Sequence, residues 1–463
     1  MPIKATSSRA QQLATLEEVI HDRKLEPNIP IWIEEAYSKG NLTKVESSNL
    51  NEALRIYKET SKVPKQLCVE LVKKIAIAQN LWINARKTNQ TNDFNRALRD
   101  VISLKRYEAD CLRDSEQDRY EALLQKFEPG QNNADLKKLL NSLREPLKSL
   151  QEKIKNKKRS VRNFSGEFEK STQLKISREI ASNLLYDFDA GRLDESLHPF
   201  SSGHRTDARI TTRVDGSNPL SCISSVMHEV GHALYEQGIP KELYTQPVGT
   251  YCSMGFHESQ SRLIENQIGR SFQYCEYLFP ILKGHFPEID ISSAFELYDN
   301  MNKVVPNYIR VDADEVTYNL HVLIRYELEE KLISGSLNVE DLNETWNTLF
   351  YRNFNIKINS PNHGFLQDIH WASGLFGYFP TYALGNLYAA CIFKKMSLEI
   401  ANLHDQIKRG QFTEIVLWLR KNIHHKARTM QPLQLLKSST GEELSTKPFI
   451  EYLESKFLHL HNI

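Results

Sequence analysis

The chain has 463 residues, and its 40% hydrophobic and 25% charged residues are typical of a folded globular protein, which excludes disorder over most of the length. Its 59 basic and 58 acidic residues leave a formal net charge of +1, too balanced for the strong field of most nucleic-acid-binding proteins. We therefore expect no nucleic-acid partner. The length exceeds the usual size of a single core and predicts two packed lobes or one large helical body.

Cysteine usage and hydropathy bear on where the protein resides. Six cysteines are scattered without a CxxC pair, which is typical of reduced thiols in a cytosolic protein. The opening segment MPIKATSSRAQQ is too polar for a signal peptide, and no later segment offers about 18 uncharged apolar residues for a membrane span. We expect a cytoplasmic protein without a membrane partner, and we interpret the basic run over 153–162 as a solvated helix face or linker.

The first part of the chain predicts a series of helices. Only 19 glycines and 17 prolines punctuate the sequence, and most windows place apolar residues three to four apart, so the fold class is mainly α. The expected N-terminal helices begin at Ser7 or Ser8 and then cover 50–61, 64–87, 92–126 and 134–158. They lack a sustained apolar heptad seam, so they predict a helical lobe or lid over residues 1–165 rather than a coiled-coil rod.

Beyond Gly166 histidine, glycine and aromatic residues become denser, and we expect residues 166–463 to carry the chemistry. The two parts are expected to form one continuous fold. The segment 207–214 (DARITTRV) alternates apolar and polar residues and predicts a β-strand. Its exposed edge could pair with an extended peptide, or it could be an ordinary edge strand with solvated charges.

The segment 218–238 predicts a helix that begins with an asparagine N-cap and a proline and stops at a glycine. Within it His228 and His232 are four residues apart and share one face, with Glu229 beside them. Neutral imidazoles suit an ion such as zinc, and a nearby carboxylate can take the proton of a water whose pKa the ion has lowered. Two histidines on one helix face can also be surface residues, so a third ligand matters.

Glu258 is the candidate for that third ligand. It lies 258 − 232 = 26 positions beyond His232, in a second predicted helix that begins near the HESQ segment. Two histidines and one glutamate form a common ligand set of catalytic zinc sites, with one position left for water. The alternative is that Glu258 only pairs with Arg262 at i+4, a weak contact of a few tenths of a kcal/mol.

Several separated segments together resemble the thermostable carboxypeptidase Taq family of metallocarboxypeptidases. The matching segments are His198-Pro199-Phe200, DARIT at 207–211, HEVGH at 228–232, HESQ at 257–260, IRVDAD at 309–314, GFLQDIHW at 364–371 and the GYFPTYALG run from Gly377. They follow the order of the family's motifs over the last part of the chain. This set is far more specific than HExxH alone.

The resemblance implies a large helical peptidase with a deep central groove and a small β-sheet beside the HExxH helix. It also implies an enzyme that releases single C-terminal residues from peptides with a free C-terminus, commonly as a homodimer. By their places in the motifs, His228, His232 and Glu258 match the ligands of one divalent ion per chain, and Glu229 matches the general base. Zinc is the expected ion, with cobalt and manganese as alternatives.

The same resemblance points to further site residues. Arg310 is the first candidate to bind the substrate carboxylate and Arg209 the second, because a guanidinium can bind a carboxylate through two hydrogen bonds. His370, Tyr378 and Tyr382 lie in the two late motifs and could donate hydrogen bonds to the developing oxyanion. Each of these three could equally be a core residue whose polar tip is satisfied.

Two other functions stay open at this point. An endo-acting oligopeptidase would use the same three ligands and the same base but would not need a free C-terminus. A non-catalytic helical scaffold would keep the ion for structure only, although such a site needs no general base. Family members usually carry a further segment before the Met-Pro that opens this chain, so the family's first helix is expected to be missing.

Overall fold

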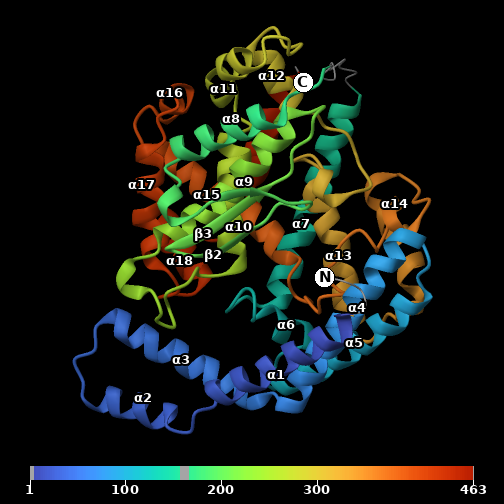
Figure 1. Cartoon of the computed structure of the whole chain (residues 1–463), viewed down its shortest axis with the longest axis vertical. Helices are drawn as coiled ribbons and strands as arrows, with labels where there is room; N and C mark the ends of the chain where they lie inside the picture. Colours follow the sequence, from blue (N-terminus) through green and yellow to red (C-terminus); the bar gives the residue numbers. More distant parts are fainter. Residues whose placement is uncertain (1–4, 157–165, 462–463) are drawn as a thin grey trace. The chain divides into compact units, whose positions relative to one another are not determined.

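The computed structural model describes residues 5–156 and 166–461. Its described residues are mainly helical and include one three-stranded β-sheet, which confirms the predicted fold class (Figure 1). The expected domain boundary at residue 165 and the larger part of the basic run over 153–162 lie outside the described residues. The boundary therefore stays a prediction.

The backbone contacts divide the chain into two compact units. Unit 1 comprises Met1–Asn141, Pro306–Ala313 and Thr317–Pro380, and unit 2 comprises Ser142–Val305, Asp314–Val316 and Thr381–Ile463. The chain thus passes between the units several times, and helix α7 (Asn133–Lys155) begins in one unit and ends in the other. A single cut along the sequence does not reproduce this division, because a segment late in the chain folds with the N-terminal helices.

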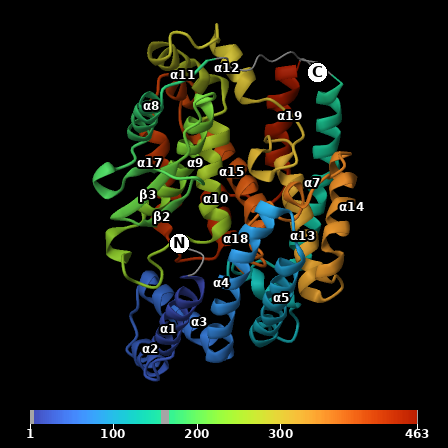
Figure 2. The same cartoon turned by 45° about the vertical axis from the view of Figure 1, so that its right-hand side comes forward.

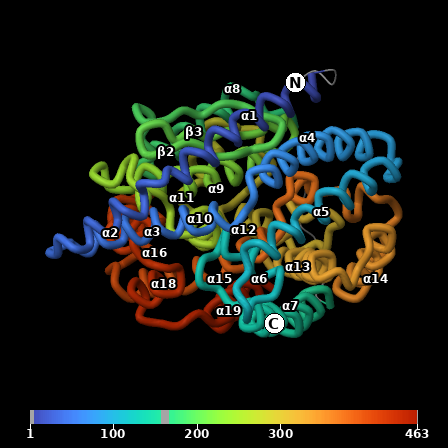
Figure 3. Tube along the Cα trace, turned by 90° about the horizontal axis from the view of Figure 1, so that it is seen from below, coloured from blue at the N-terminus to red at the C-terminus, as the bar shows by residue number. Residues whose placement is uncertain are grey.

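The described residues of unit 1 form helices and turns. The elements are α1 (Thr6–Lys24), α2 (Ile29–Ser38), α3 (Lys44–Lys62), α4 (Lys65–Thr88), α5 (Asn92–Leu112), α6 (Arg119–Leu124), the start of α7, η5 (Arg310–Asp312), α13 (Tyr318–Ser334), η6 (Val339–Asp341), α14 (Leu342–Phe354) and η7 (Pro361–His363). Helix α13 lies beside α14 (Figure 2), and α4 lies beside α5 (Figure 3).

The single helix expected over 92–126 is wrong, because the structure forms two helices there. Helix α5 ends at Leu112, where Arg113 turns to an extended conformation with φ −61° and ψ 144°. Helix α6 begins anew after Asp118, whose side chain accepts a hydrogen bond of 2.7 Å from the backbone N–H of Glu121. Residues 113–118 (RDSEQD) are all polar and interrupt the apolar periodicity, and the Asp118 cap marks the start of the second helix.

Unit 2 holds the sheet and the remaining helices. Its elements are the end of α7, α8 (Lys170–Asn183), η2 (Phe188–Ala190), β1 (Leu193–Glu195), β2 (Ser201–His204), β3 (Asp207–Thr212), α9 (Pro219–Gly238), η3 (Lys241–Leu243), α10 (Met254–Arg262), the π-helix η4 (Leu263–Ile268), α11 (Phe272–His285), α12 (Ala294–Met301), α15 (Pro380–Glu399), α16 (Leu403–Lys408), α17 (Thr413–Asn422), η8 (His424–Lys426), α18 (Pro432–Thr440) and α19 (Lys447–His461). Helix α9 packs on β3, so the sheet lies beside the helix that carries HEVGH, as expected.

The strand expected at 207–214 forms as β3, but it is the central strand and not an edge. The strand order is β1-β3-β2, with β1 parallel and β2 antiparallel to β3. Leu193 pairs with Ile210 on one side of β3, and Ser202 pairs with Arg209 on the other. Both ladders use the hydrogen-bonding groups of β3, so a peptide that joined this sheet would have to add to β1 or β2.

Two further observations concern the whole described chain. Among the described helices, none combines the length and the apolar character that a membrane span requires. All six cysteines are free thiols, and four of them are buried.

Candidate metal centre

Helix α9 holds the two histidines and Glu229 of HEVGH. The side chain of Asn218 caps the helix by accepting a hydrogen bond of 3.1 Å from the backbone N–H of Leu220. The side chains of His228 and His232 are 20% and 14% exposed, so they lie partly open at the surface of an otherwise buried helix. The predicted helix and the shared face of its two histidines are confirmed.

Two glycines allow the neighbouring helices to approach closely. A Cβ atom added to Gly231 would lie 2.5 Å from the carbonyl oxygen of Gln260 and from Cα of Ser261 on α10. A Cβ atom added to Gly385 on α15 would lie 2.5 Å from Cγ of Glu258. Such distances are well inside van der Waals contact, which explains why the structure accepts the cost of about 1 kcal/mol for a glycine inside a helix.

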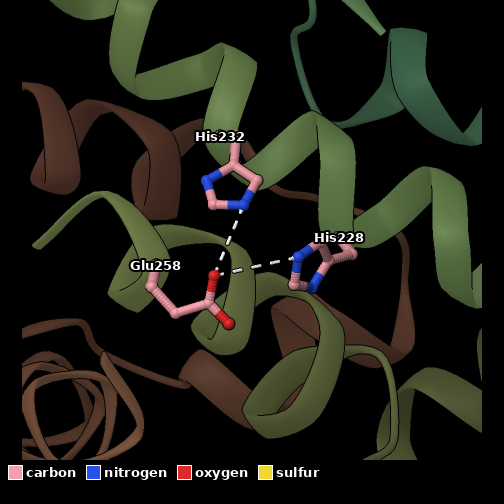
Figure 4. Close-up of side chains that lie close together, drawn as sticks. All are labelled: His228, His232 and Glu258. Atoms are coloured by element: carbon pink, nitrogen blue, oxygen red, sulfur yellow. Dashed lines mark ion pairs between the residues drawn. The ribbon is translucent and has the colours of Figure 1, made fainter. Parts of the chain in front are cut away.

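This packing brings Glu258 to the two histidines. Its Oε2 atom lies 3.5 Å from Nε2 of His232 and 4.0 Å from Nε2 of His228, and Figure 4 shows the three side chains pointing toward one another. One ligand atom from each residue lies within 4.8 Å of the other two. Within the part of the chain that the structure describes, this is the one such group of three or more potential metal ligands.

The contacts of the two imidazoles fit a bound cation. Nδ1 of His228 lies 2.9 Å from Oε2 of Glu265, and Nδ1 of His232 lies 3.0 Å from the carbonyl oxygen of His257. A carboxylate and a carbonyl accept hydrogen bonds, so each Nδ1–H donates and each Nε2 is left to bind an ion. The donor set of two imidazoles and one carboxylate therefore fits a divalent ion such as zinc.

Glu265 is a neighbour of the cluster that no sequence motif indicated. It lies in the π-helix that follows α10, it is 8% exposed, and it accepts hydrogen bonds of 2.9 Å from Arg270 and 3.3 Å from Arg262. Burial alone would raise the pKa of Glu265, but the hydrogen bond from His228 and the two guanidinium charges hold that pKa well below its ordinary value. The available signal was a carboxylate seven residues after Glu258, two helical turns along.

Glu258 has both of the contacts that the sequence left open. Its Oε1 atom accepts a hydrogen bond of 2.6 Å from Nε of Arg262, four residues later, while its Oε2 atom faces the histidines. The pairing with Arg262 therefore does not compete with metal binding. It orients the carboxylate so that the second oxygen points toward the imidazoles.

Glu229 and His257 surround the same cluster. Burial raises the pKa of Glu229 to about 7, against the charge of His228, which lowers it. Nε2 of His257 lies 3.0 Å from Oε1 of Glu236, and the His257 ring stacks on His232 with ring centroids 4.5 Å apart. His257 of HESQ, which the sequence left without a role, thus supports His232 through both its backbone carbonyl and its ring.

The two arginine candidates differ in burial and belong to different units. In unit 1, Arg310 is 5% exposed and donates to Oδ1 of Asp368 over 3.1 and 2.8 Å and to the hydroxyl of Tyr318 over 2.9 Å. Arg325 is fully buried and donates to Oδ2 of the same Asp368 over 2.7 Å. In unit 2, Arg209 is exposed on β3 and pairs with Asp207 over 2.7 Å.

Of the three candidate oxyanion donors, two lie together. The rings of His370 and Tyr378, both in unit 1, have centroids 5.4 Å apart, and each side chain is partly exposed. Tyr382 belongs to unit 2 and lies on α15 one turn before Gly385, the glycine that packs against Glu258. Tyr382 thus lies in the same unit as the metal cluster, on the helix that packs against Glu258.

Comparisons with known proteins agree with these motifs. The family model of carboxypeptidase Taq (M32) metallopeptidases matches residues 1–457. Thermostable carboxypeptidase 1 of Thermus thermophilus is 37% identical over all of this chain and 93% of its own length. Carboxypeptidase 1 of Bacillus subtilis is 33% identical over 99% of this chain and 93% of its own length. Among solved structures, metallocarboxypeptidase 1 of Trypanosoma cruzi has a TM-score of 0.93 at 34% identity, covering 99% of this chain and 93% of its own.

Proposed function

The chain belongs to the carboxypeptidase Taq (M32) family and is a metallocarboxypeptidase, and from this premise we propose which of its residues carry out the reaction. His228, His232 and Glu258 would hold one divalent ion, most suitably zinc, with cobalt or manganese as substitutes. The observation that supports this most is the convergence of their three ligand atoms within 4.8 Å. Metal analysis of the purified protein tests the identity and the number of ions.

A divalent ion held there would act as a Lewis acid on the scissile carbonyl and lower the pKa of a nearby water toward roughly 7. Glu229 is the general base: its buried carboxylate takes a proton from the attacking water and passes it to the leaving amine. Glu229 is buried and directly follows His228, so its carboxylate lies beside the place where the ion would be held. His370, Tyr378 and Tyr382 are the proposed donors to the developing oxyanion.

The free carboxylate of the substrate needs a cation, and Arg310 is the first candidate. Arg310 and Arg325 both pair with one carboxylate, Asp368, so two guanidinium groups lie together here, and a guanidinium can bind a substrate carboxylate through two hydrogen bonds. Arg209 is the second candidate, since its guanidinium is exposed but already pairs with Asp207. Peptides with a free C-terminus are therefore the proposed substrates, with broad side-chain specificity if backbone and carboxylate contacts dominate.

Mass spectrometry of one N-blocked peptide, with either a free or an amidated C-terminus, tests this function. We expect stepwise C-terminal losses from the free peptide only, and Glu229→Gln should lower kcat by about 10²–10⁴-fold, the range for loss of general acid–base catalysis. Arg310→Gln should raise KM about 10-fold or more, because hydrogen bonds to charged groups contribute roughly 1.5–3 kcal/mol. Arg209→Gln, at the second candidate, is measured beside it.

The other outcomes of this experiment have distinct meanings. Internal cuts in both peptides would favour the endo-acting alternative, and bound metal without any hydrolysis would favour the non-catalytic scaffold. A larger effect of Arg209→Gln than of Arg310→Gln would exchange the roles of the two arginines.

We further propose that the protein is a cytoplasmic homodimer. The six free thiols support the compartment, and the family resemblance supports the dimer. Light scattering of the purified protein tests the dimer, and cell fractionation tests the compartment.

A further inference from the structure

The connection between η7 and α15 carries His370 and Tyr378, yet the structure forms only turns and bends there. Residues 364–379 are described throughout, and none of them is in a helix or a strand. The length of this loop exceeds roughly 12–15 residues. Connections longer than that, without secondary structure, are uncommon and usually functional. No helix or strand ladder holds this loop, so single backbone turns and the side chains that bind it together determine its shape.

One buried carboxyl group, that of Glu329 on α13, binds this loop at two points. Oε1 of Glu329 accepts a hydrogen bond of 3.0 Å from the indole N–H of Trp371, and Oε2 accepts one of 3.1 Å from the backbone N–H of Gly377. The hydroxyl of Tyr120 donates to the same Oε2 over 2.8 Å. All of these residues belong to unit 1, and Glu329 has no exposed surface.

The two anchored residues are the direct neighbours of the two proposed donors. His370 precedes Trp371, and Tyr378 follows Gly377. Gly377 has φ +88°, and a Cβ atom there would lie 2.8 Å from the backbone nitrogen of Leu124, so this end of the loop is held against the C-terminal end of α6. Movement of either anchor would therefore displace the adjacent imidazole or phenol.

A carboxyl group is the side chain that this arrangement requires. An indole N–H and a backbone N–H can only donate, and they bind different oxygens of Glu329. Either oxygen of a carboxyl can accept, whether or not the group carries a proton. The amide of a glutamine has one accepting oxygen and one donating nitrogen, so it can satisfy only one of the two anchors.

The Glu329 carboxyl lies in an environment that disfavours its charge. Burial raises the pKa of Glu329 to about 8, even though its three donors and the charge of Arg325 lower it, so the carboxyl is held in an unfavourable environment. Arg325, one helical turn earlier, directs its guanidinium to Asp368 and Gln367. An apolar side chain here would leave the N–H groups of Trp371 and Gly377 unpaired in the core, so the carboxyl is kept by the two anchors that it holds.

We propose that Glu329 is a positioning residue of the peptidase, which sets the places of the His370 imidazole and the Tyr378 phenol by holding Trp371 and Gly377. The inference rests on the proposed function, in which these two side chains donate to the developing oxyanion. Donors of this kind act in the transition state more than in substrate binding, so their displacement lowers kcat rather than raising KM.

The test compares Glu329→Gln with Tyr120→Phe in the zinc-loaded full chain, with kcat, KM, bound metal and thermal midpoint measured for each. We expect Glu329→Gln to lower kcat by about 10²-fold, the effect of losing one oxyanion donor, with KM and bound metal nearly unchanged. Tyr120→Phe removes a hydroxyl but leaves both anchors on the carboxyl, so its kcat should stay within a few-fold of wild type.

The double variant Glu329→Gln/Trp371→Phe provides a second, independent readout. Removal of the indole N–H leaves the amide oxygen to Gly377 and Tyr120, which share one oxygen in the wild type, so the double variant should be no slower than Glu329→Gln. The inference would be overturned by additive losses in kcat in the double variant, by an unchanged kcat in Glu329→Gln, or by a lower thermal midpoint with unchanged kcat.

If Glu329→Gln does not fold, the single variant Trp371→Phe decides, and a wild-type kcat in Trp371→Phe overturns the inference. Release of C-terminal residues by wild type in the same assay establishes the proposed function separately.

Discussion

The metal cluster of unit 2 and the loop over 364–379 in unit 1 are built in opposite ways. The cluster uses regular helices: His228 and His232 are one turn apart on α9, and Glu258 lies on α10, which two glycines allow to pack closely. The loop has no regular secondary structure, and buried side chains such as Glu329 and Asp368 hold it. Helix geometry places the ligands, whereas buried charge and hydrogen bonds place the loop.

This difference has a consequence for mutational effects. A helix-borne ligand is positioned by many backbone hydrogen bonds, so one changed contact around it alters metal affinity moderately. The loop depends on a few buried charged groups, and removal of one leaves its partners unpaired in the core, which costs far more.

Asp368→Asn should cause the largest loss of stability. Asp368 binds Arg310 and Arg325, both buried, and the neutral amide would leave these two guanidinium charges uncompensated. Loss of one partner of a buried ion pair costs about 3–5 kcal/mol, so the free energy of unfolding from urea titrations at pH 7 should fall by about that amount. Asp110→Asn is the control, because its pair with Arg119 is about one third exposed and should contribute less than about 1 kcal/mol.

The same variant has a defined pH dependence. Burial would raise the pKa of Asp368, but the charges of Arg310 and Arg325 hold it well below the ordinary value of 3.8. A carboxyl with a lowered pKa in the folded state contributes its full stabilisation above pH 3.8 and loses it as the pH falls further. The difference between wild type and Asp368→Asn should therefore be constant from pH 5 to 7 and shrink below about pH 4. A difference that grows on acidification would contradict this assignment.

The same contrast explains what could be predicted from the sequence. The HEVGH helix and its neighbour were predictable, because 3.6-residue periodicity, a cap and a glycine stop all agree between 218 and 238. The central position of β3 was not, since pairing partners over 193–195 and 201–204 have no strong strand pattern of their own. The break after Leu112 has a signal in the all-polar run over 113–118 and the Asp118 cap, yet the prediction placed one helix across it.

The partners of the site residues were the least predictable part. Glu265 lies only seven residues beyond Glu258, but its contact with His228 depends on the π-helix that follows α10. Glu329 is more than 40 residues from Trp371 and lies in a segment that reads as an ordinary packing helix. Local periodicity indicates which face of a helix is buried, but it does not indicate which distant donor a buried carboxyl will meet.

Gly385→Ala should have the next largest effect, on the helix-borne side of the comparison. The new methyl group would lie 2.5 Å from Cγ and 2.7 Å from Cβ of Glu258, atoms close to the backbone that cannot move aside freely. Overpacking of this kind costs about 1–3 kcal/mol of unfolding free energy, and it should also weaken metal binding because Glu258 is displaced. Gly284→Ala on α11 is the matched control, since its Cβ would meet no atom within 4 Å, and helix propensity predicts a slight gain in stability.

Glu265→Gln tests the metal cluster itself: it should weaken metal binding, and it should also lower the free energy of unfolding, because Glu265 pairs with Arg262 and Arg270 in the core. The amide keeps the shape of the side chain and can still accept from His228, but it lacks the charge that makes the imidazole a stronger ligand. Loss of such an outer partner typically weakens metal affinity about 10–100-fold, equivalent to about 1.4–2.7 kcal/mol. Competition of the protein with a fluorescent zinc chelator at pH 7 measures this change. An unchanged zinc affinity would show that Arg262 and Arg270 hold the cluster in place without the Glu265 charge, and a loss far beyond 100-fold would mean that helix geometry alone does not position the ligands.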